Sequence, residues 1–257
     1  MLNRHAVATA LTSVLFCATP NTDALAAPFQ VGDFITYSQQ SWGSLGSAAE
    51  QTLLNHFAAM YSNGVELGIP GGLGASALFT TVQAIQSFLP AIGSAGPLAN
   101  DYLDPVSTSS GTLGGYVLAT KFNVDFNDAS LLAGSAATRL GELVLVHLTA
   151  FVVEGVVEDF TDVNGMSVRQ FLVAANTCLG GGPCLHSYEG MSLLAGDLSG
   201  AFDGGTPTPF AQTYLRLPAG LPPVPEPGTM TLLGIGLAAI GLCRSTGRPR
   251  VRSLRKT

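Results

Sequence analysis

The sequence predicts an α+β fold: a mainly helical globular body with one small sheet, flanked by a signal peptide and a single short C-terminal hydrophobic helix. Three observations support this prediction. Apolar residues recur at helical spacing after helix-start signals, and other short stretches alternate apolar and polar residues as strands do. The 31 glycines and only 11% charged residues indicate a loop-rich globular chain, not a charged disordered one. The expected segments are a signal peptide (1–26), an exported globular domain (27–216), a proline-rich spacer (217–227), a short transmembrane or sorting helix (228–243) and a basic cytoplasmic tail (244–257).

The N-terminal segment is typical of a secretory signal peptide. Arg4 supplies a charged start, and residues 6–18 supply an apolar core that is too short for a stable membrane anchor. Ala24 and Ala26 fit the small-x-small cleavage rule of signal peptidase. We therefore expect cleavage before Ala27 and export of the chain that follows.

Helix-start signals place four helices in the body. Three segments combine Ser or Thr with Glu or Gln three residues later, the pattern of a capping box, in which both side chains satisfy free backbone N–H groups. These segments are 47–50, 80–83 and 167–170. We expect the three helices to end at 63–64, at Pro90 and at 180–182, where glycine or proline stops them. A fourth helix is expected through Met191, Leu194, Leu198 and Phe202, ending near 203–205.

Strand patterns are shorter and less decisive. Residues 29–37 are a candidate strand, and residues 121–127 alternate apolar and polar side chains, as expected of a half-buried strand. The run 140–157 is rich in β-branched residues and is compatible with either a buried strand or a buried helix. Glu142, His147 and Glu154 interrupt this run and argue against a membrane span.

Charge is divided unequally along the chain. Residues 27–225 carry fifteen acidic and four basic side chains, a net charge of about −11, whereas the segment from Arg244 onward carries six positive charges. An acidic body argues against nucleic acid and anionic lipid surfaces as partners. This division suits a soluble exported domain followed by a basic tail.

Two cysteines remain in the body once the terminal segments are set aside. Cys178 and Cys184 are six residues apart across a glycine-rich loop, in a chain that we expect in an oxidising compartment. We expect a disulfide between them, and two free thiols are the alternative. A metal site is not expected, because His186 is the only additional nearby ligand and zinc-ligand spacings are absent.

The body contains no recognisable catalytic motif, and we expect no cofactor. His56 lies in a predicted amphipathic helix and His147 in an apolar run, so packing or surface roles are favoured for both. A Ser-His-Asp triad that meets only in space stays open, although no serine is singled out. Residues 125–128 and 154–164 are rich in carboxylates. Solvated acidic loops are favoured there over calcium sites, because no glycine stands at the sixth loop position, and over a pair of glycosidase acids.

The C-terminal apolar segment is short for a permanent membrane span. Its sixteen residues, 228–243, contain no charge and extend about 24 Å as a helix, against about 30 Å of bilayer hydrocarbon. The basic residues that follow favour the cytoplasmic side, so the body is expected on the exported side. They include Arg244, Arg248, Arg250 and Arg252. The proline-rich spacer 217–227 is expected to be stiff and extended.

The C-terminal segment resembles the PEP-CTERM sorting signal of Gram-negative bacteria, because the apolar segment and basic end follow Val224, Pro225, Glu226 and Pro227. This motif is sometimes labelled an ice-binding protein C-terminal domain. The resemblance implies recognition and processing by an exosortase, an integral-membrane cysteine peptidase, in an organism that makes exopolysaccharide. The tail departs from the pattern by its length. Segments 34–39 and 164–168 resemble uncharacterised bacterial surface proteins, which implies no activity.

We therefore expect a protein exported across the inner membrane, transiently anchored through its C-terminal helix, and then released to the cell surface or the extracellular matrix. It is expected to be non-enzymatic and associated with exopolysaccharide or biofilm, with signal peptidase and an exosortase as partners. The alternative is a secreted hydrolase acting on polysaccharide or peptide. A pocket that joins His147 or His186 to a serine or to paired carboxylates would favour the hydrolase.

Overall fold

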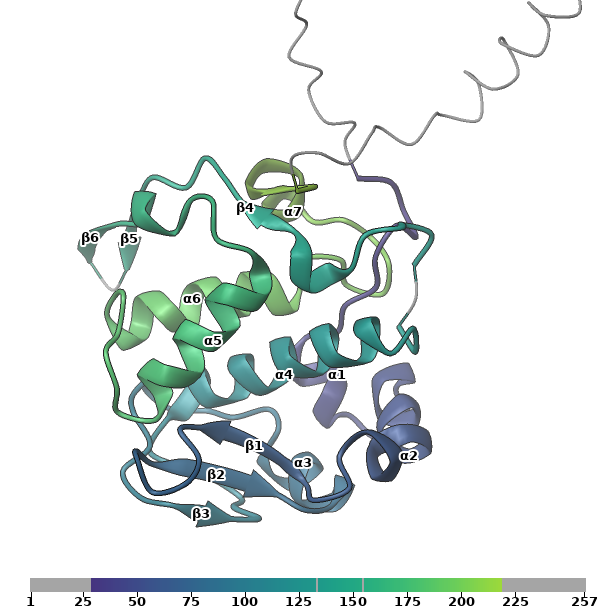
Figure 1. Cartoon of the computed structure of the whole chain (residues 1–257), viewed down its shortest axis with the longest axis vertical. Helices are drawn as coiled ribbons and strands as arrows, with labels where there is room; N and C mark the ends of the chain where they lie inside the picture. Colours follow the sequence, from purple (N-terminus) through teal and green to yellow (C-terminus); the bar gives the residue numbers. More distant parts are fainter. Residues whose placement is uncertain (1–28, 133, 154, 219–257) are drawn as a thin grey trace, which may run out of the picture.

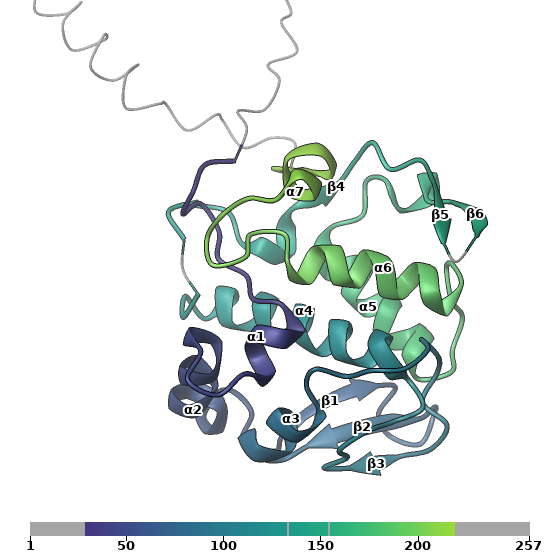
Figure 2. The same cartoon turned by 180° about the vertical axis from the view of Figure 1, so that it is seen from behind.

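One helix, α4 (Gly111–Asp128), runs through the middle of the body, and the other elements pack around it (Figures 1 and 2). The computed structural model describes residues 29–132, 134–153 and 155–218, so the expected signal peptide and C-terminal helix lie outside the described residues. On one side of α4 lie α5 (Val168–Leu179) and α6 (Tyr188–Ser199). A three-stranded sheet lies on the other side.

The described part of the chain forms a mixed α/β body with seven α-helices and several small sheets. The remaining α-helices are α1 (Gln39–Gly43), α2 (Ala48–Met60), α3 (Val82–Phe88) and α7 (Pro209–Tyr214), and the 3-10 helices are η1 (Leu140–Glu142) and η2 (Thr161–Val163). The strands are β1 (Val65–Gly68), β2 (Ser76–Phe79), β3 (Tyr102–Leu103), β4 (Val144–Leu145), β5 (Ala150–Val153), β6 (Val156–Asp159) and β7 (Leu215–Arg216).

The prediction of a single small sheet was wrong, because the described strands form three. β2 pairs with β1 antiparallel and with β3 parallel, so that Ala77 lies opposite both Leu67 and Tyr102. β4 pairs with β7, and β5 pairs with β6, both antiparallel. Each strand has only two to four residues. Strands this short carry too few residues for an alternating pattern to stand out in the sequence.

The predicted strand at 121–127 was also wrong, because this segment belongs to α4. The helix is buried on almost every side, so Phe122 and Phe126 on one face and Val124 on another are all in the core. Lys121 and Asp125, one turn apart, are among the few α4 residues that keep part of their side chains in solvent, and they form an ion pair of 2.8 Å. Period-2 alternation therefore reflects a helix surrounded by protein, which has no single apolar stripe.

Asn123 explains how a polar residue can occupy the core of α4. Its side chain is fully buried, and its amide nitrogen donates to the backbone oxygens of Tyr37 (2.9 Å) and Ser199 (3.0 Å). Its amide oxygen accepts from the Tyr37 backbone N–H at 2.9 Å and from the Trp42 indole N–H at 3.3 Å. Asn123 thereby joins α4, the α6 terminus and the N-terminal segment, while satisfying its own hydrogen-bonding groups.

The N-terminal segment 29–37 is not the predicted strand. Its only β contact within the described residues is a single parallel bridge between Thr36 and Asp203. Phe34 is buried and packs against the ring of Phe202 at a centroid distance of 5.0 Å. The segment is therefore held by side-chain packing and isolated backbone bonds such as Thr36 N–H to Phe202 O at 2.9 Å.

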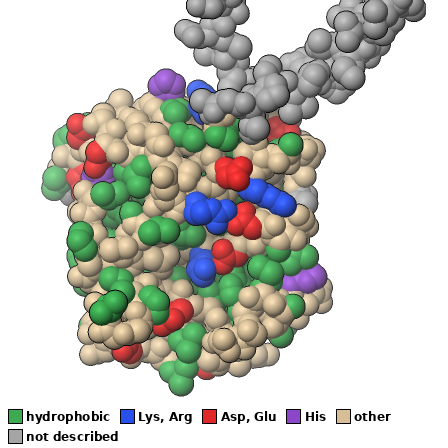
Figure 3. Space-filling model, viewed as in Figure 1, with side chains coloured by type: hydrophobic (Ala, Val, Ile, Leu, Met, Phe, Trp, Pro, Cys, Tyr) green, Lys and Arg blue, Asp and Glu red, His purple; other side chains and the backbone are tan. Residues whose placement is uncertain are grey.

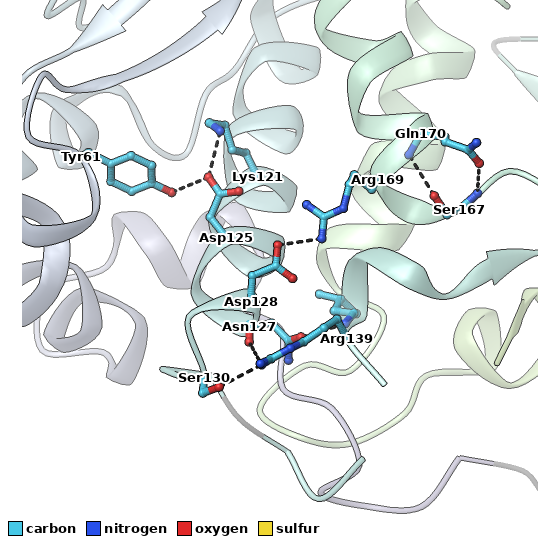
Figure 4. Close-up of polar contacts among 11 residues, drawn as sticks. Tyr61, Lys121, Asp125, Asn127, Asp128, Ser130, Arg139, Ser167, Arg169 and Gln170 are labelled. Carbon is cyan, nitrogen blue, oxygen red and sulfur yellow. Dashed lines mark hydrogen bonds and ion pairs between the residues drawn. The ribbon is translucent and has the colours of Figure 1, made fainter. Parts of the chain in front are cut away.

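The helix starts agree with the sequence in part. At α5 the full capping box is present, since Ser167 Oγ accepts from Gln170 N–H (3.2 Å) and Gln170 Oε1 accepts from Ser167 N–H (2.8 Å) (Figure 4). Ser47 caps α2, but the Glu50 carboxylate accepts from Gly46 N–H instead of from Ser47. For α3 the cap is Thr81, one residue later than predicted.

The shifted cap of α3 has a tertiary cause. Thr80 donates from both its backbone N–H and its hydroxyl to the Asp104 carboxylate, each at 2.6 Å. Thr80 therefore belongs to the loop after β2, and Thr81 accepts from Ala84 N–H. The run 140–157, for which the sequence left strand and helix open, contains η1, β4 and β5, and β6 begins within it.

A disulfide joins Cys178 to Cys184, whose Cα atoms are 4.5 Å apart. It links the last turn of α5 to the loop that leads to α6. Cys178 is fully buried, whereas Cys184 is half-buried. The bond therefore fixes the turn between two helices that both pack on α4.

We expect the disulfide to stabilise the body by about 2 kcal/mol, because closing a loop of this length removes that much chain entropy from the unfolded state. Urea unfolding of the wild type with and without reductant should show this difference. The C178A/C184A double variant is the control, and reductant should leave its unfolding unchanged. Equal unfolding of the oxidised and reduced wild type would contradict the expectation.

We expect N123A to lower the free energy of unfolding by at least about 3 kcal/mol, because it leaves four polar groups without a partner, two of them from buried hydrogen bonds and two from part-buried ones. N55A is the matched control, since Asn55 is exposed on α2, and it should change stability by less than about 0.5 kcal/mol. Chemical denaturation followed by circular dichroism measures both. Similar effects of the two variants would show that Asn123 does not carry this role.

Candidate functional site

A cleft of about 780 Å³ opens between the N-terminal half of α4, one side of α6, the β5–β6 hairpin and the loop that follows α3. Its lining is mainly polar on the helices and apolar on the hairpin. The lining residues are Ser38, Gly93, Ser94, Ala95, Thr112, Tyr116, Val152, Val153, Glu189, Ser192, Leu193, Gly196, Asp197 and Ser199. Its size is within the usual range of small-ligand sites.

The wall that α6 contributes follows from helix periodicity. Glu189, Ser192 and Leu193, and then Gly196 and Asp197, are spaced three or four residues apart and therefore share one side of the helix. The opposite stripe, Met191, Leu194, Ala195 and Leu198, is buried in the core. Packing of the apolar stripe thus directs the polar stripe toward the cleft.

Asp197 has the most unusual environment in the cleft. Its carboxyl group reaches solvent, yet the protein atoms around it raise its pKa above the ordinary value by burial. It also borders a small apolar cavity of about 20 Å³ formed with Phe151, Phe160 and Phe210, among others. Among the described residues it has no hydrogen-bond or ion-pair partner. Its position in the last turn of α6 places a negative charge at the negative end of the helix dipole.

The hydroxyl groups of the cleft leave a donor unused. Ser192, only 5% exposed, and Thr112 form one hydrogen bond between their Oγ and Oγ1 atoms at 3.1 Å. Two hydroxyl groups supply two hydrogens, and this bond uses one. The second hydrogen has no acceptor among the described residues and can serve a bound molecule.

Gly196 lets the ring of Tyr116 lie directly against α6. A Cβ atom at this glycine would meet three ring atoms of Tyr116 at 3.3–3.4 Å, closer than ordinary van der Waals contact. α4 and α6 approach closely here, and Thr120 Oγ1 lies 3.1 Å from the backbone oxygen of Ala195 one turn further along. The glycine therefore keeps an aromatic side chain in the cleft wall.

His186 does not line the cleft. Its ring stacks on Phe160 at a centroid distance of 4.2 Å, and its Nε2 and Nδ1 lie 2.9 Å and 3.7 Å from carboxylate oxygens of Asp162 and Glu158. The neighbouring Ser187 hydroxyl donates to Glu158, not to His186. The arrangement lacks the contact between nucleophile and base that a catalytic serine needs. It ties β6 and η2 to the start of α6.

The other candidates from the sequence are also separate from the cleft. His147 is exposed with a positive φ of 59°, and His56 is half-buried on α2. Trp42, the only tryptophan, is fully buried and stacks on Phe126, so it offers no surface for a sugar. A cleft containing two carboxylates is present, but the structure does not join either carboxylate to His147 or His186.

The acidic stretch 125–128 is not the solvated loop that the sequence favoured, because it ends α4. Asp125 accepts from Tyr61 O–H and from Lys121, each at 2.8 Å, and burial together with this aspartate raises the pKa of Tyr61 (Figure 4). Asp128 pairs with Arg169 at 2.7 Å. Figure 3 shows cationic and acidic side chains side by side on this face.

Oxygen atoms of the second acidic stretch, 154–164, also accept hydrogen bonds from the protein. Asp159 accepts from Thr161 N–H at 2.9 Å. Asn164 forms two hydrogen bonds of 2.9 Å with the Leu148 backbone. Within the described ranges, no group of three or more His, Cys, Asp or Glu side chains is arranged to hold a metal ion.

The predicted sorting and cleavage residues lie outside the described residues. These are Ala24, Ala26, Ala27, Val224, Pro225, Glu226, Pro227, Arg244, Arg248, Arg250 and Arg252. The described ends nevertheless lie together beside α7, where Gln212 Nε2 donates to the Phe29 backbone oxygen at 2.7 Å (Figure 1). None of the helices in the described ranges has both the length and the hydropathy needed to cross a bilayer.

Sequence reasoning missed the cleft, although one signal was available. Glu189, Ser192, Gly196 and Asp197 form a polar stripe opposite the apolar stripe of the fourth predicted helix. An ordinary solvated helix face has the same pattern. The walls from α4 and the hairpin, which distinguish a cleft from such a face, come from distant parts of the chain.

Comparison with known proteins identifies the C-terminal segment. Residues 223–245 match the family profile of the PEP-CTERM protein-sorting motif. No curated protein and no solved structure is significantly similar to the chain. A chain with this motif is exported and sorted toward the cell surface through its C-terminal segment, with processing by an exosortase.

We expect D197N to increase the free energy of unfolding at pH 7 by about 0.3–1 kcal/mol, because it removes a negative charge from the last turn of α6. Burial raises the folded-state pKa, so the ionised carboxylate opposes folding above that pKa, and the gain should disappear below about pH 3.9, where both states are protonated. Urea unfolding at pH 7 and pH 3 measures this.

E142Q is the matched control for D197N, since Glu142 is an exposed carboxylate in η1, away from the cleft. E142Q also removes one negative charge, but from a side chain outside the cleft. We expect its stability to stay within about 0.5 kcal/mol of the wild type at both pH values. A D197N variant less stable than the wild type at pH 7 would show that Asp197 has a stabilising partner.

Proposed function

We propose that this protein is a non-enzymatic component of the cell surface or extracellular matrix of a Gram-negative bacterium, where it associates with exopolysaccharide. The observation that carries the proposal is the sorting motif at residues 223–245, which follows a folded body whose described part ends at Pro218. The protein is held transiently through its C-terminal segment and is then processed by the exosortase.

The arrangement of the body supports this route. Both described ends of the body lie beside α7 (Figure 2). The cleft is lined by α6, the first half of α4 and the hairpin, and none of its lining residues belongs to α7. The cleft therefore stays available when the body is held by its C-terminal end.

The geometry of the two cleft carboxylates favours binding over hydrolysis. Glu189 and Asp197 are eight residues apart on one helix, which separates their backbone positions by about 12 Å. Glycosidases place their two carboxyl groups about 5.5 Å apart for retention or about 6.5–9.5 Å apart for inversion. The two side chains would have to lean far toward each other to reach these distances.

A secreted hydrolase is the second candidate, and the raised pKa of Asp197 is the observation that favours it, since burial shifts this carboxyl group toward the protonated form that a general acid needs. Release of reducing ends from polysaccharide distinguishes the two candidates. Turnover by the wild type that is lost in D197N would support the hydrolase, and its absence would support binding.

We expect replacement of Pro225, Glu226 and Pro227 by alanine to leave the protein longer and trapped in the inner membrane, because the exosortase no longer recognises the motif. The P218A/P222A variant is the control, since it removes two spacer prolines outside the matched residues and should be processed normally. Fractionation, immunoblotting and intact mass in an exosortase-containing host measure both. Unchanged size and location of the triple variant would overturn the proposed role of the motif.

A further inference from the structure

We propose that the cleft between α4 and α6 binds a polysaccharide segment that carries free, protonated amino groups, with Asp197 and Glu189 as the acidic partners of those amines. This inference rests on the proposed function, because it takes the exopolysaccharide as the ligand. It goes further by assigning the binding site and the chemical class of the sugar. The argument depends on the charge, the hydroxyl groups and the shape of the cleft.

The charge of the cleft selects against anionic polymers. Glu189 and Asp197 both line it, and no Lys or Arg is among its lining residues. The four cationic side chains in the described residues are engaged elsewhere. Lys121 and Arg169 pair with Asp125 and Asp128, Arg139 donates to Asn127 O and Ser130 Oγ, and Arg216 donates to backbone oxygens of Gln212 and Leu215. Uronate or sulfated sugars would therefore meet uncompensated repulsion.

An ammonium group of a ligand would neutralise the negative charge of Asp197, which has no cationic partner among the described residues. This carboxyl group is partly enclosed by apolar side chains, has no partner among the described residues, and lies at the unfavourable end of α6. A ligand cation beside it forms a charge-assisted hydrogen bond, which is stronger than a bond between neutral groups. Glu189 lies about 12 Å further along the helix and can meet a second sugar residue of the same chain.

The uncharged part of the lining suits a sugar. Ser192 and Thr112 retain one unused hydroxyl hydrogen, and Ser94 adds an exposed hydroxyl group across the cleft. Tyr116 supplies an aromatic side chain held in place by Gly196. A volume of about 780 Å³ accommodates a short oligosaccharide. Hydroxyl donors around an aromatic wall are what sugar hydroxyls and ring C–H groups require.

The proposal is tested with the full-length protein, purified in mild detergent, by calorimetric titration at pH 6. The probes are a fully deacetylated glucosamine hexamer, its N-acetylated counterpart, a uronate oligomer and a lysine-rich peptide. We expect the deacetylated hexamer to bind, and the acetylated hexamer and the uronate to bind at least about tenfold more weakly, because neither offers an ammonium group to Asp197.

D197N and E189Q should each weaken binding of the deacetylated hexamer about tenfold or more, while E142Q should bind as the wild type does. Urea unfolding verifies that each variant is folded, and E189Q serves if D197N is not. Equal binding of both hexamers, or unchanged binding by both cleft variants, would overturn the inference. Binding of the peptide alone would also overturn it and assign a protein partner instead. Fractionation of cells tests the proposed function separately, so its failure is distinguishable from failure of the cleft.

Discussion

Burial of α4 on nearly all sides is the constraint on which the rest of the body depends. Polar side chains on the buried faces of this helix must be satisfied internally, and Asn123 does so by bonding the N-terminal segment, the Trp42 indole and the end of α6. It must also allow close approach of its neighbours. Gly115 does this, because a Cβ atom there would lie 2.0 Å from the Gln39 side-chain oxygen. Hydrogen bonding at Asn123 and the small size of Gly115 together hold the N-terminal segment, α1 and the end of α6 on one helix.

The cleft is a consequence of the same packing. α6 packs more extensively on α4 than any other element does, and the apolar stripe of α6 is buried in that contact. Its polar stripe then faces the hairpin β5–β6, which is held near α6 by the contacts of Glu158 with His186 and Ser187. The His186 group, which the sequence raised as a possible catalyst, thus contributes to the site by positioning one of its walls.

Asp197 shows how a site can be recognised without a motif. Stability alone would place a neutral or basic residue in the last turn of α6, yet the chain has a partly enclosed carboxylate there, with no partner among the described residues. Such local conflicts concentrate at functional positions. Because Asp197 lies in the cleft, the cleft is the stronger candidate for a functional site. The described carboxylates of the stretches 125–128 and 154–164 instead have protein partners.

The sequence by itself determined the sorting segment and the helices with strong local signals. The sorting motif at residues 223–245 is a linear segment, and the Ser167 capping box depends on residues three positions apart, so both are visible without a fold. Tertiary structure alone decided the rest. The alternation at 121–127 suggested a strand because no local feature of the sequence reveals that α4 is surrounded by protein. Thr80 does not cap α3 because it bonds to Asp104, 24 residues away. The cleft joins residues from 38 to 199, and only packing brings them together.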